Sequence, residues 1–225
     1  MLREVLTGLV CSLAGVAAAG PLETTLARMD QSAAMFRDLT ADLKKTHHVG
    51  VINEDTDDSG VIYLKRAKSN VTLMRFDIKR PDPKQVAVDT REAQIYYPKS
   101  NIVQVYDIAK YKKQADLLLL LGFGTTSREL QSAYMVSYGG SEALNGQNTT
   151  RIQLTPKSDA AHLSKVELWI SDTTGFPVQQ KLYWGADGGD YDVAAYSNMK
   201  VNSNVPDSAL KLELPKSVQR EYPQR

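Results

Sequence analysis

Cysteine is almost absent from this sequence of 225 residues, and the single one, Cys11, lies in an apolar N-terminal run. The run Val5–Val16 is too short to span a membrane comfortably, and three small residues, Ala17–Ala19, follow it. This pattern predicts a signal peptide, residues 1–19, that is cleaved near Ala19. It disfavours lipidation of Cys11, because the apolar run continues beyond that residue. The mature chain would then fold without disulfide bonds and would need a hydrophobic core.

A strong charge of one sign is also missing. The formal net charge is +1, so electrostatics give no reason to expect a nucleic-acid partner. No apolar run after the signal peptide is long enough to span a bilayer, and no composition break or repeat divides the chain. We therefore expect residues 20–225 to form a single soluble domain that acts as a monomer in the periplasm.

Recognised catalytic and metal-binding motifs are lacking as well. The three histidines are His47, His48 and His162, and their positions suggest no nucleophile–histidine–acid set. The sequence has no P-loop, dinucleotide-binding, zinc-protease or nucleophile-elbow motif. The acidic run Glu54–Asp58 lacks the glycine and the distal glutamate of a calcium loop, so it indicates a solvated hairpin loop. We expect no catalytic residue, no metal and no cofactor, and a protein that is not an enzyme.

What the sequence does contain, directly after the signal peptide, is one long amphipathic pattern. Apolar residues recur every three or four positions, and Pro21 stands near the start. This spacing predicts an amphipathic helix that buries its apolar stripe on a sheet. The stripe residues are Leu22, Leu26, Met29, Ala33, Phe36, Leu39 and Leu43.

From Thr46 onward, the pattern changes to short β-type runs separated by turn residues. Such a series predicts a mainly β protein with helices (α+β), in which about eleven antiparallel strands form an open, strongly curved barrel. The candidate runs lie near 46–52, 59–66, 71–78, 84–90, 93–97, 102–107, 134–139, 149–155, 164–171, 177–184, 190–201 and 209–214.

The run at 71–78 carries a charged residue among apolar neighbours. The two-residue period of a strand puts Leu73, Arg75 and Asp77 on one face. A guanidinium group on such a face needs hydrogen-bond acceptors or water. The pattern alone leaves two alternatives open: an ion pair between Arg75 and Asp77 on a solvated face, or a functional role for Arg75.

One segment interrupts the series of β-type runs. Five leucines, Leu117–Leu121, precede Gly122, Phe123 and Gly124. Because leucine favours helix, we expect a short helix that stops at Gly122. The segment either packs as a second core helix or covers a hydrophobic opening as a lid, for which the two glycines would be hinges.

Six short motifs, in order along the chain, resemble those of one family. Together they make the chain similar to the periplasmic outer-membrane lipoprotein carriers, the LolA-like lipoprotein-sorting family. The insert Leu117–Gly124 is closer to the broader lipoprotein-sorting branch than to the best-studied carriers. The motifs are Gly60–Arg66, Leu73–Asp77 with Pro81, Asp89–Pro98, Ile152–Lys157, Gly175–Gln180 and Leu214–Val218.

The resemblance implies that helices close the concave side of the barrel over an apolar cavity. The implied function is to bind the acyl chains of lipoproteins, or related lipids, and to carry them from an inner-membrane donor transporter to an outer-membrane acceptor. By analogy with the family's arginine, Arg75 would latch the closed lid by donating to its carbonyl groups. The lid residues would be Leu117, Leu118, Leu121 and Phe123.

The candidate cavity residues are apolar, although the two-residue period alone does not say which face of the sheet is concave. They are Leu26, Met29, Phe36, Val71, Leu73, Val86, Val88, Ile95, Ile102, Leu154, Leu168, Ile170 and Leu182.

Two other functions remain open on the sequence alone. The first is a ligand-sensing regulatory module of the same fold that binds a membrane-anchored partner protein. The second is a hydrolase with an unrecognised site. Co-purifying lipid would favour the carrier, a stable complex without lipid would favour the sensor, and turnover of an ester or glycan would favour the hydrolase.

Overall fold

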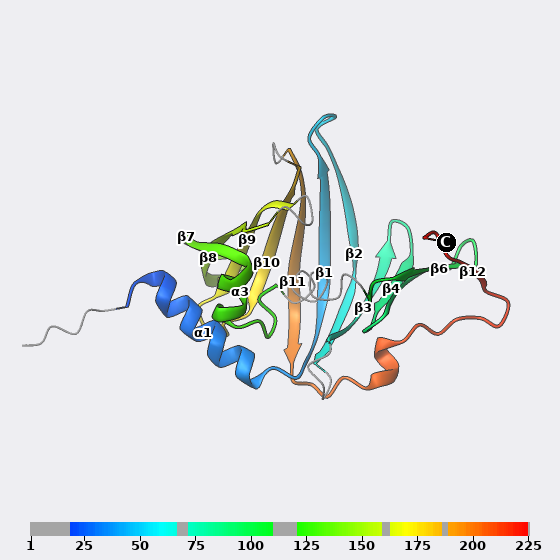
Figure 1. The fold of residues 1–225 in the computed structure, drawn as a ribbon, viewed down its shortest axis with the longest axis horizontal. Coiled ribbons are helices and arrows are strands. Elements are labelled where there is room, and N and C mark those ends of the chain that lie inside the picture. The colour runs from blue at the N-terminus through cyan, green and yellow to red at the C-terminus, as the bar shows by residue number, and fades with distance from the viewer. Residues whose placement is uncertain (1–18, 67–71, 110–120, 159–162, 186–188, 225) are drawn as a thin grey trace, which may run out of the picture.

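The strands of the protein form one twelve-stranded sheet, in the order β12-β6-β5-β4-β3-β2-β1-β11-β10-β9-β8-β7. The computed structural model describes residues 19–66, 72–109, 121–158, 163–185 and 189–224. Neighbouring strands are antiparallel, except that β12 runs parallel to β6. The sheet is open and curled (Figure 1), which confirms the predicted fold class.

The strand bounds are as follows: β1 (Asp38–Val49), β2 (Glu54–Arg66), β3 (Thr72–Arg80), β4 (Lys84–Val88), β5 (Glu92–Tyr97), β6 (Ile102–Asp107), β7 (Tyr134–Leu144), β8 (Gln147–Pro156), β9 (Leu163–Ser171), β10 (Pro177–Trp184), β11 (Asp190–Val201) and β12 (Gln219–Glu221).

The N-terminal helix α1 spans Pro21–Met35 and is shorter than the predicted stripe. Phe36 already has an extended backbone, with φ −69° and ψ 126°, and β1 begins at Asp38. The helix prediction was wrong for Leu39 and Leu43, because a step of four residues is a repeat of both a helix and a strand. Both side chains instead lie on one face of β1.

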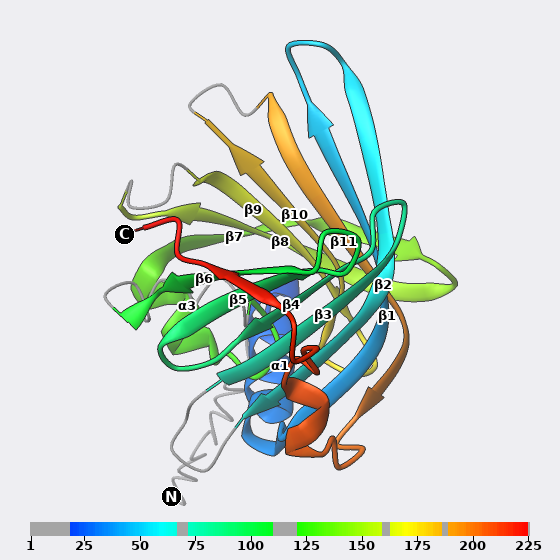
Figure 2. The same cartoon turned by 90° about the vertical axis from the view of Figure 1, so that its right-hand side faces the viewer.

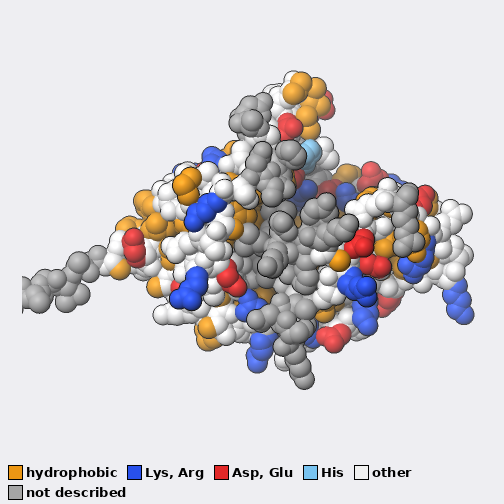
Figure 3. All heavy atoms as spheres, in the orientation of Figure 1, with side chains coloured by type: hydrophobic (Ala, Val, Ile, Leu, Met, Phe, Trp, Pro, Cys, Tyr) orange, Lys and Arg blue, Asp and Glu red, His pale blue; other side chains and the backbone are white. Residues whose placement is uncertain are grey.

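The hairpin of β1 and β2 turns at residues 50–53, not at Glu54–Asp58 as predicted. The acidic residues belong to β2, where Asp55 pairs with His48 and Asp57 pairs with Lys44 across the hairpin. Such cross-strand pairs of opposite charge stabilise a strand that its composition does not favour. The tip of the hairpin ends the molecule at the top of Figure 3, and its apolar residues are Val51 (95% exposed) and Ile52 (60% exposed).

The helices lie on the face of the sheet that we call the inner face, which carries Leu39, Leu43 and Ile62. One buried cluster on this face contains these three residues and Phe36, which follows α1. A second cluster joins side chains of α1 and α3 (Ser127–Ala133) to those of β8 and β9. The hydrophobic core therefore lies on the inner face, over both halves of the sheet.

The C-terminal part of the chain crosses the opposite face, the outer face, over β3–β6 (Figure 2). We call residues 205–218 the strap. The strand predicted at 209–214 is wrong, because this region consists of the short 3-10 helix η2 (Asp207–Leu210) and irregular chain. Leu212 and Leu214 of the strap pack against Tyr96 and Val103 in a third, smaller cluster.

Candidate functional site

The inner face is the apolar surface on which most of the predicted cavity residues meet. One buried cluster includes Leu154, Leu168 and Ile170, and Val166 lies among them without being predicted. Ile95 and Ile102 share this face through their strand registers, because Ile95 lies opposite Val86 and Ile102 follows the same alternation on β6. The predicted residues placed here are Leu26, Met29, Phe36, Val86, Val88, Ile95, Ile102, Leu154, Leu168, Ile170 and Leu182.

Leu73 does not belong to this surface, and Val71 lies outside the described residues. The side chain of Met74 is buried in the inner-face cluster, so its neighbour Leu73 points to the outer face. The sequence pattern gave two candidate faces for β3 and no means to choose between them, and the cavity role of Leu73 stays a prediction.

The described part of the predicted lid, residues 121–124, packs into the inner face. Leu121 is 0% exposed and Phe123 is 1% exposed. The Phe123 ring meets the Tyr196 ring edge-on, with 5.1 Å between centroids. Leu117 and Leu118 lie outside the described residues, so the lid role of the whole segment stays a prediction.

Two backbone contacts hold the segment 121–124 in place. The side-chain amide of Gln180 donates to the carbonyl oxygen of Leu121 at 2.6 Å. The Arg66 guanidinium donates to the carbonyl oxygen of Gly124, and also to that of Ala33 in the last turn of α1 at 3.3 Å. Arg66 thus ties the end of α1 to the lid segment.

Gly124 makes the close approach of Arg66 possible. It has φ +73°, and a Cβ atom at this position would lie 2.7 Å from both the Arg66 guanidinium and the Phe36 ring. A larger residue would therefore be strained and would also displace the arginine. A glycine at position 124 therefore leaves the space that the Arg66 contact needs.

The contact that we predicted for Arg75 is thus made by Arg66 in this structure. Arg75 lies on the outer face, where it donates to both carboxylate oxygens of Asp77 at 2.7 and 3.0 Å. It also donates to the carbonyl oxygen of Lys211 in the strap at 2.7 Å. The alternative of an Arg75–Asp77 ion pair is confirmed, but the pair lies beneath the strap rather than on a solvated face, with side chains 12% and 20% exposed.

Arg66 was missed although it ends a motif that we had singled out. The two-residue period places it on the face of Ile62 and Leu64, which are both buried. A charged residue at the end of such an apolar row was the available signal.

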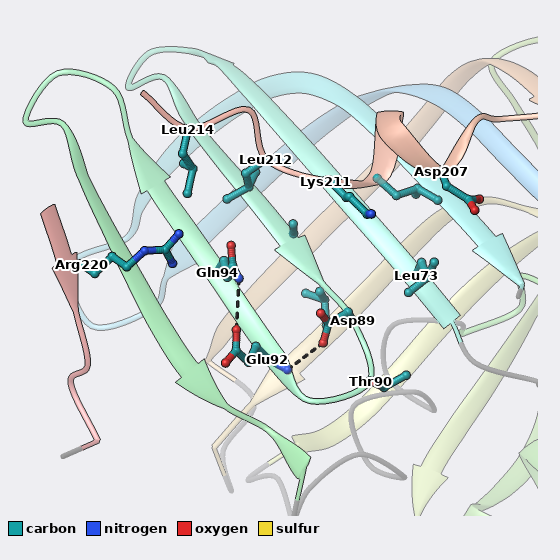
Figure 4. Close-up of a pocket in the computed structure, with 13 residues that line it drawn as sticks. Leu73, Asp89, Thr90, Glu92, Gln94, Asp207, Lys211, Leu212, Leu214 and Arg220 are labelled. Atoms are coloured by element: carbon teal, nitrogen blue, oxygen red, sulfur yellow. Dashed lines mark hydrogen bonds between the residues drawn. The ribbon is translucent and has the colours of Figure 1, made fainter. Parts of the chain in front are cut away.

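A pocket of about 530 Å³ opens on the outer face between the strap and β3–β5 (Figure 4). Leu73, Leu212 and Leu214 contribute apolar surface, and Asp89 and Glu92 lie among them. Asp89 accepts hydrogen bonds from two backbone N–H groups of the β4–β5 turn at 2.8 and 2.9 Å. This pocket mixes charges with leucines and is therefore a poorer match for acyl chains than the inner face.

Helix α3 was not predicted, although its start carries a clear signal. The Thr126 hydroxyl accepts from the backbone N–H of Glu129, and the Glu129 carboxylate accepts from the backbone N–H of Thr126. This reciprocal arrangement is a capping box, which the spacing Thr-x-x-Glu indicates. The helix buries Leu130 in the inner-face core directly after the lid segment.

Within the described ranges, no helix is long and apolar enough to cross a membrane. The same residues contain no group of three or more His, Cys, Asp or Glu side chains that is placed to hold a metal ion.

Comparisons with solved structures identify the same architecture in several proteins of low sequence identity. A conserved protein from Thermus thermophilus matches with a TM-score of 0.56 and 13% identity, over 88% of this chain and 96% of that one. The crystal structure of MucB matches with a TM-score of 0.54 and 13% identity, over 87% of this chain and 64% of MucB. The Mycobacterium tuberculosis lipoprotein LppX matches with a TM-score of 0.50 and 14% identity, over 84% of this chain and 99% of LppX.

These likenesses concern the fold alone, and no curated protein matches the sequence of the chain. The family model of the outer membrane lipoprotein carrier protein LolA, however, matches residues 35–212, well over half of the chain. This range includes all strands of the sheet except β12, together with the lid segment and Arg66. The chain therefore belongs to the LolA family of outer membrane lipoprotein carrier proteins.

Proposed function

We propose that this protein is a periplasmic carrier that binds the acyl chains of lipoproteins, or related lipids, on the inner face of its sheet. It receives them from an inner-membrane donor and delivers them to an outer-membrane acceptor. The observation that carries this proposal is the apolar inner face over which Leu121 and Phe123 are packed. Membership of the LolA family supports the same function.

A carrier needs an affinity that permits release, and the lid segment provides the opposing free energy. Burial of a methylene group contributes about 0.8 kcal/mol, so a long acyl chain on a dry surface would be held almost irreversibly. In the closed protein Leu121 and Phe123 occupy the inner face themselves. Cargo has to displace them, which costs about 1.5–3 kcal/mol for each side chain that becomes exposed. The net affinity is lowered by that amount.

Arg66 adds to this opposing free energy. Its acceptors in the described structure are the carbonyl oxygens of Gly124 and Ala33, and both bonds are charge-assisted. Opening the lid breaks at least the bond to Gly124. Arg66 therefore favours the closed, empty state, and any ligand that binds only the open state must overcome this preference.

The proposal is tested by asking what the protein carries. Protein purified from the periplasm of its host is examined by native mass spectrometry, and uptake of a fluorescent fatty acid is then measured on delipidated protein. We expect bound lipid or acylated protein, and saturable uptake of the probe. A matched pair of variants locates the site: Leu182→Glu on the inner face should abolish uptake, whereas Leu212→Glu in the strap on the outer face should preserve it.

Two results would contradict the carrier function. One is protein that carries no lipid and takes up no probe. The other is uptake that Leu212→Glu abolishes and Leu182→Glu leaves intact. A stable complex with a membrane-anchored protein in the absence of lipid would instead establish the regulatory function.

A further inference from the structure

A band of charged residues crosses the inner face beyond its apolar part. Lys45 and His47 follow Leu39 and Leu43 along β1 in steps of two residues, so they lie on the same face as those leucines. Asp192 lies opposite His47 on β11, and Asp58 lies opposite Lys45 on β2. We call Lys45, His47, Asp58, Lys84 and Asp192 the charged band. It lies toward the hairpin end of β1, at the far end of this strand from the end of α1 (Figure 1).

The charged band is held together by short contacts. Asp192 lies 3.1 Å from Lys45 Nζ and 2.9 Å from His47 Nδ1, and it accepts a hydrogen bond from Trp184 Nε1 at 2.9 Å. Lys84 Nζ lies 3.5 Å from an Asp58 carboxylate oxygen. Burial by itself would raise the pKa of Asp192, but Lys45, His47 and Trp184 outweigh it and hold this pKa below the ordinary value. Asp192 therefore stays ionised and orients the two basic side chains.

The accessible part of the band is basic. The side chains of Asp192 and Asp58 are 16% and 18% exposed, whereas those of Lys84, Lys45 and His47 are 35%, 41% and 46% exposed. A lysine ammonium group has three N–H donors, so one bond to a carboxylate leaves donors for a further acceptor. A ligand that reaches this end of the inner face meets the basic groups before the carboxylates.

The band directly adjoins the apolar surface. Leu182 is the cross-strand partner of Asp192, and Leu43 precedes Lys45 by one two-residue repeat, about 7 Å along the strand. A chain of methylene groups that lies on Leu43 and Leu182 would place its first polar group at the band. The apolar and basic surfaces together match an amphipathic molecule.

We propose that the charged band binds the anionic head group, a phosphate or a carboxylate, of the acyl-bearing cargo. Lys45 and His47 contact the head group, and Asp192 positions them. This inference rests on the proposed function, because it requires that the acyl chain lie along the inner face.

The test uses three ligands with one acyl length and different heads: lauryl phosphate, laurate and the neutral monolaurin, each below its micelle concentration. The inner variant is Lys45→Gln with His47→Gln. The matched control is Lys44→Gln with His48→Gln. These neighbours on the same strand point to the outer face, where each also has an acidic partner, Asp57 and Asp55. Thermal unfolding and circular dichroism confirm that both variants are folded.

We expect the inner variant to lose about tenfold in affinity for the anionic ligands and to bind monolaurin as before. The control should bind all three like the native protein. A loss of affinity for lauryl phosphate alone would mean that the band binds phosphate. A loss of affinity for both lauryl phosphate and laurate would mean that it binds either a phosphate or a carboxylate. Should the inner variant fail to fold, Lys84→Gln takes its place, with Lys99→Gln as its exposed control.

The inference is overturned if the inner variant binds the anionic ligands as tightly as the control does. It is also overturned if the inner variant loses as much affinity for monolaurin as for the anionic ligands. In that case binding of all three ligands would still support the carrier function. If none of the three ligands binds the native protein, the result contradicts both the proposed carrier function and the proposed head-group site.

Discussion

Two arginines, nine residues apart in the sequence, fasten a covering segment to each face of the same sheet. On the inner face, Arg66 donates to carbonyl oxygens of the lid segment and of α1. On the outer face, Arg75 donates to the strap carbonyl of Lys211 and is paired through two bonds with Asp77. Arg75 is paired with a carboxylate on its own strand, whereas the described acceptors of Arg66 are neutral carbonyl groups of α1 and of the lid segment.

The two covering segments are held on the sheet to different extents. The strap rests on its own apolar cluster and is tied at several points, among them Lys65 to Asp207 and Asn101 to the backbone carbonyl of Ser217. Among the described residues, the side chains of Gln180 and Arg66 donate to the lid segment, which packs on the larger apolar surface. Under the proposed carrier function, we therefore expect cargo to displace the lid segment from the inner face and to leave the strap in place.

The largest expected effect is on the free energy of unfolding, and it distinguishes the lid segment from the rest of the hydrophobic core. Leu121 and Leu168 are both 0% exposed on the inner face, but Leu168 belongs to β9, which pairs with a strand on each side. Leu168→Ala should lower the free energy of unfolding by about 2–5 kcal/mol. Leu121→Ala should cost less than half of that, because the lid can open without unfolding the sheet. Urea denaturation measures both values, and equal losses would identify Leu121 as ordinary core.

The next largest effect is the loss of stability expected when the contact between Arg75 and the strap is removed. Arg75→Leu leaves Asp77 without its partner under the strap and removes the tie to Lys211, so we expect a loss of about 1–3 kcal/mol in unfolding free energy. The double variant Arg75→Leu with Asp77→Leu should recover part of this loss, because no unpaired carboxylate remains. Uptake of a fatty acid should be unchanged in both variants. Altered uptake would assign the outer face a part in cargo binding.

A smaller effect on stability but a larger one on cargo is expected for Arg66. Arg66→Leu removes charge-assisted bonds that favour the closed lid, so cargo should be retained about tenfold more tightly and transferred less well. Lysine should restore transfer only in part, because it lacks the planar fork of donors. Retention and transfer to acceptor vesicles are measured side by side. Unchanged or weaker retention would refute the role of Arg66 as the latch.

The smallest effect is a pH dependence of stability that arises from Asp192. Its pKa is lower in the folded protein than the ordinary value of 3.8, so its contribution to stability is full well above pH 3.8. The contribution is lost as the pH falls toward the folded pKa. Asp192→Asn should therefore lower stability at neutral pH and flatten the acid limb of the stability curve below about pH 5. An unchanged acid limb would show that Asp192 gains nothing from Lys45 and His47.

The sequence predicted the repeating strands well, because alternation of apolar residues over short runs is a local property. It predicted less well where one pattern suits two structures. Leu39 and Leu43 fit a helix or a strand, and Leu210, Leu212 and Leu214 alternate as in a strand. Leu212 and Leu214 nevertheless lie in irregular chain of the strap, packed on the outer face. Whether an extended segment pairs through its backbone or packs through its side chains depends on distant residues.

The residues of the candidate site were also only partly predictable from the sequence. Alternation correctly separated Leu73 and Arg75 from Met74, but the choice of the inner face depends on which row α1 and the lid segment cover. The same rule applied to β2 puts Arg66 beside Ile62 and Leu64, and only the folded chain brings Gly124 to it. A contact over 58 residues of sequence has no local signal.

Locating a bound acyl chain on one face of the sheet directly tests whether the inner face binds cargo. Methyl NMR spectra are recorded with a fatty acid that carries a nitroxide on its chain, and with the same ligand after reduction of the nitroxide. We predict strong broadening of inner-face methyl groups such as those of Leu43, Ile62 and Leu182, and sharp signals from Val103, Val105 and Leu212 on the outer face. Broadening confined to the outer face, or none on either face, would contradict the claim that the inner face binds acyl cargo.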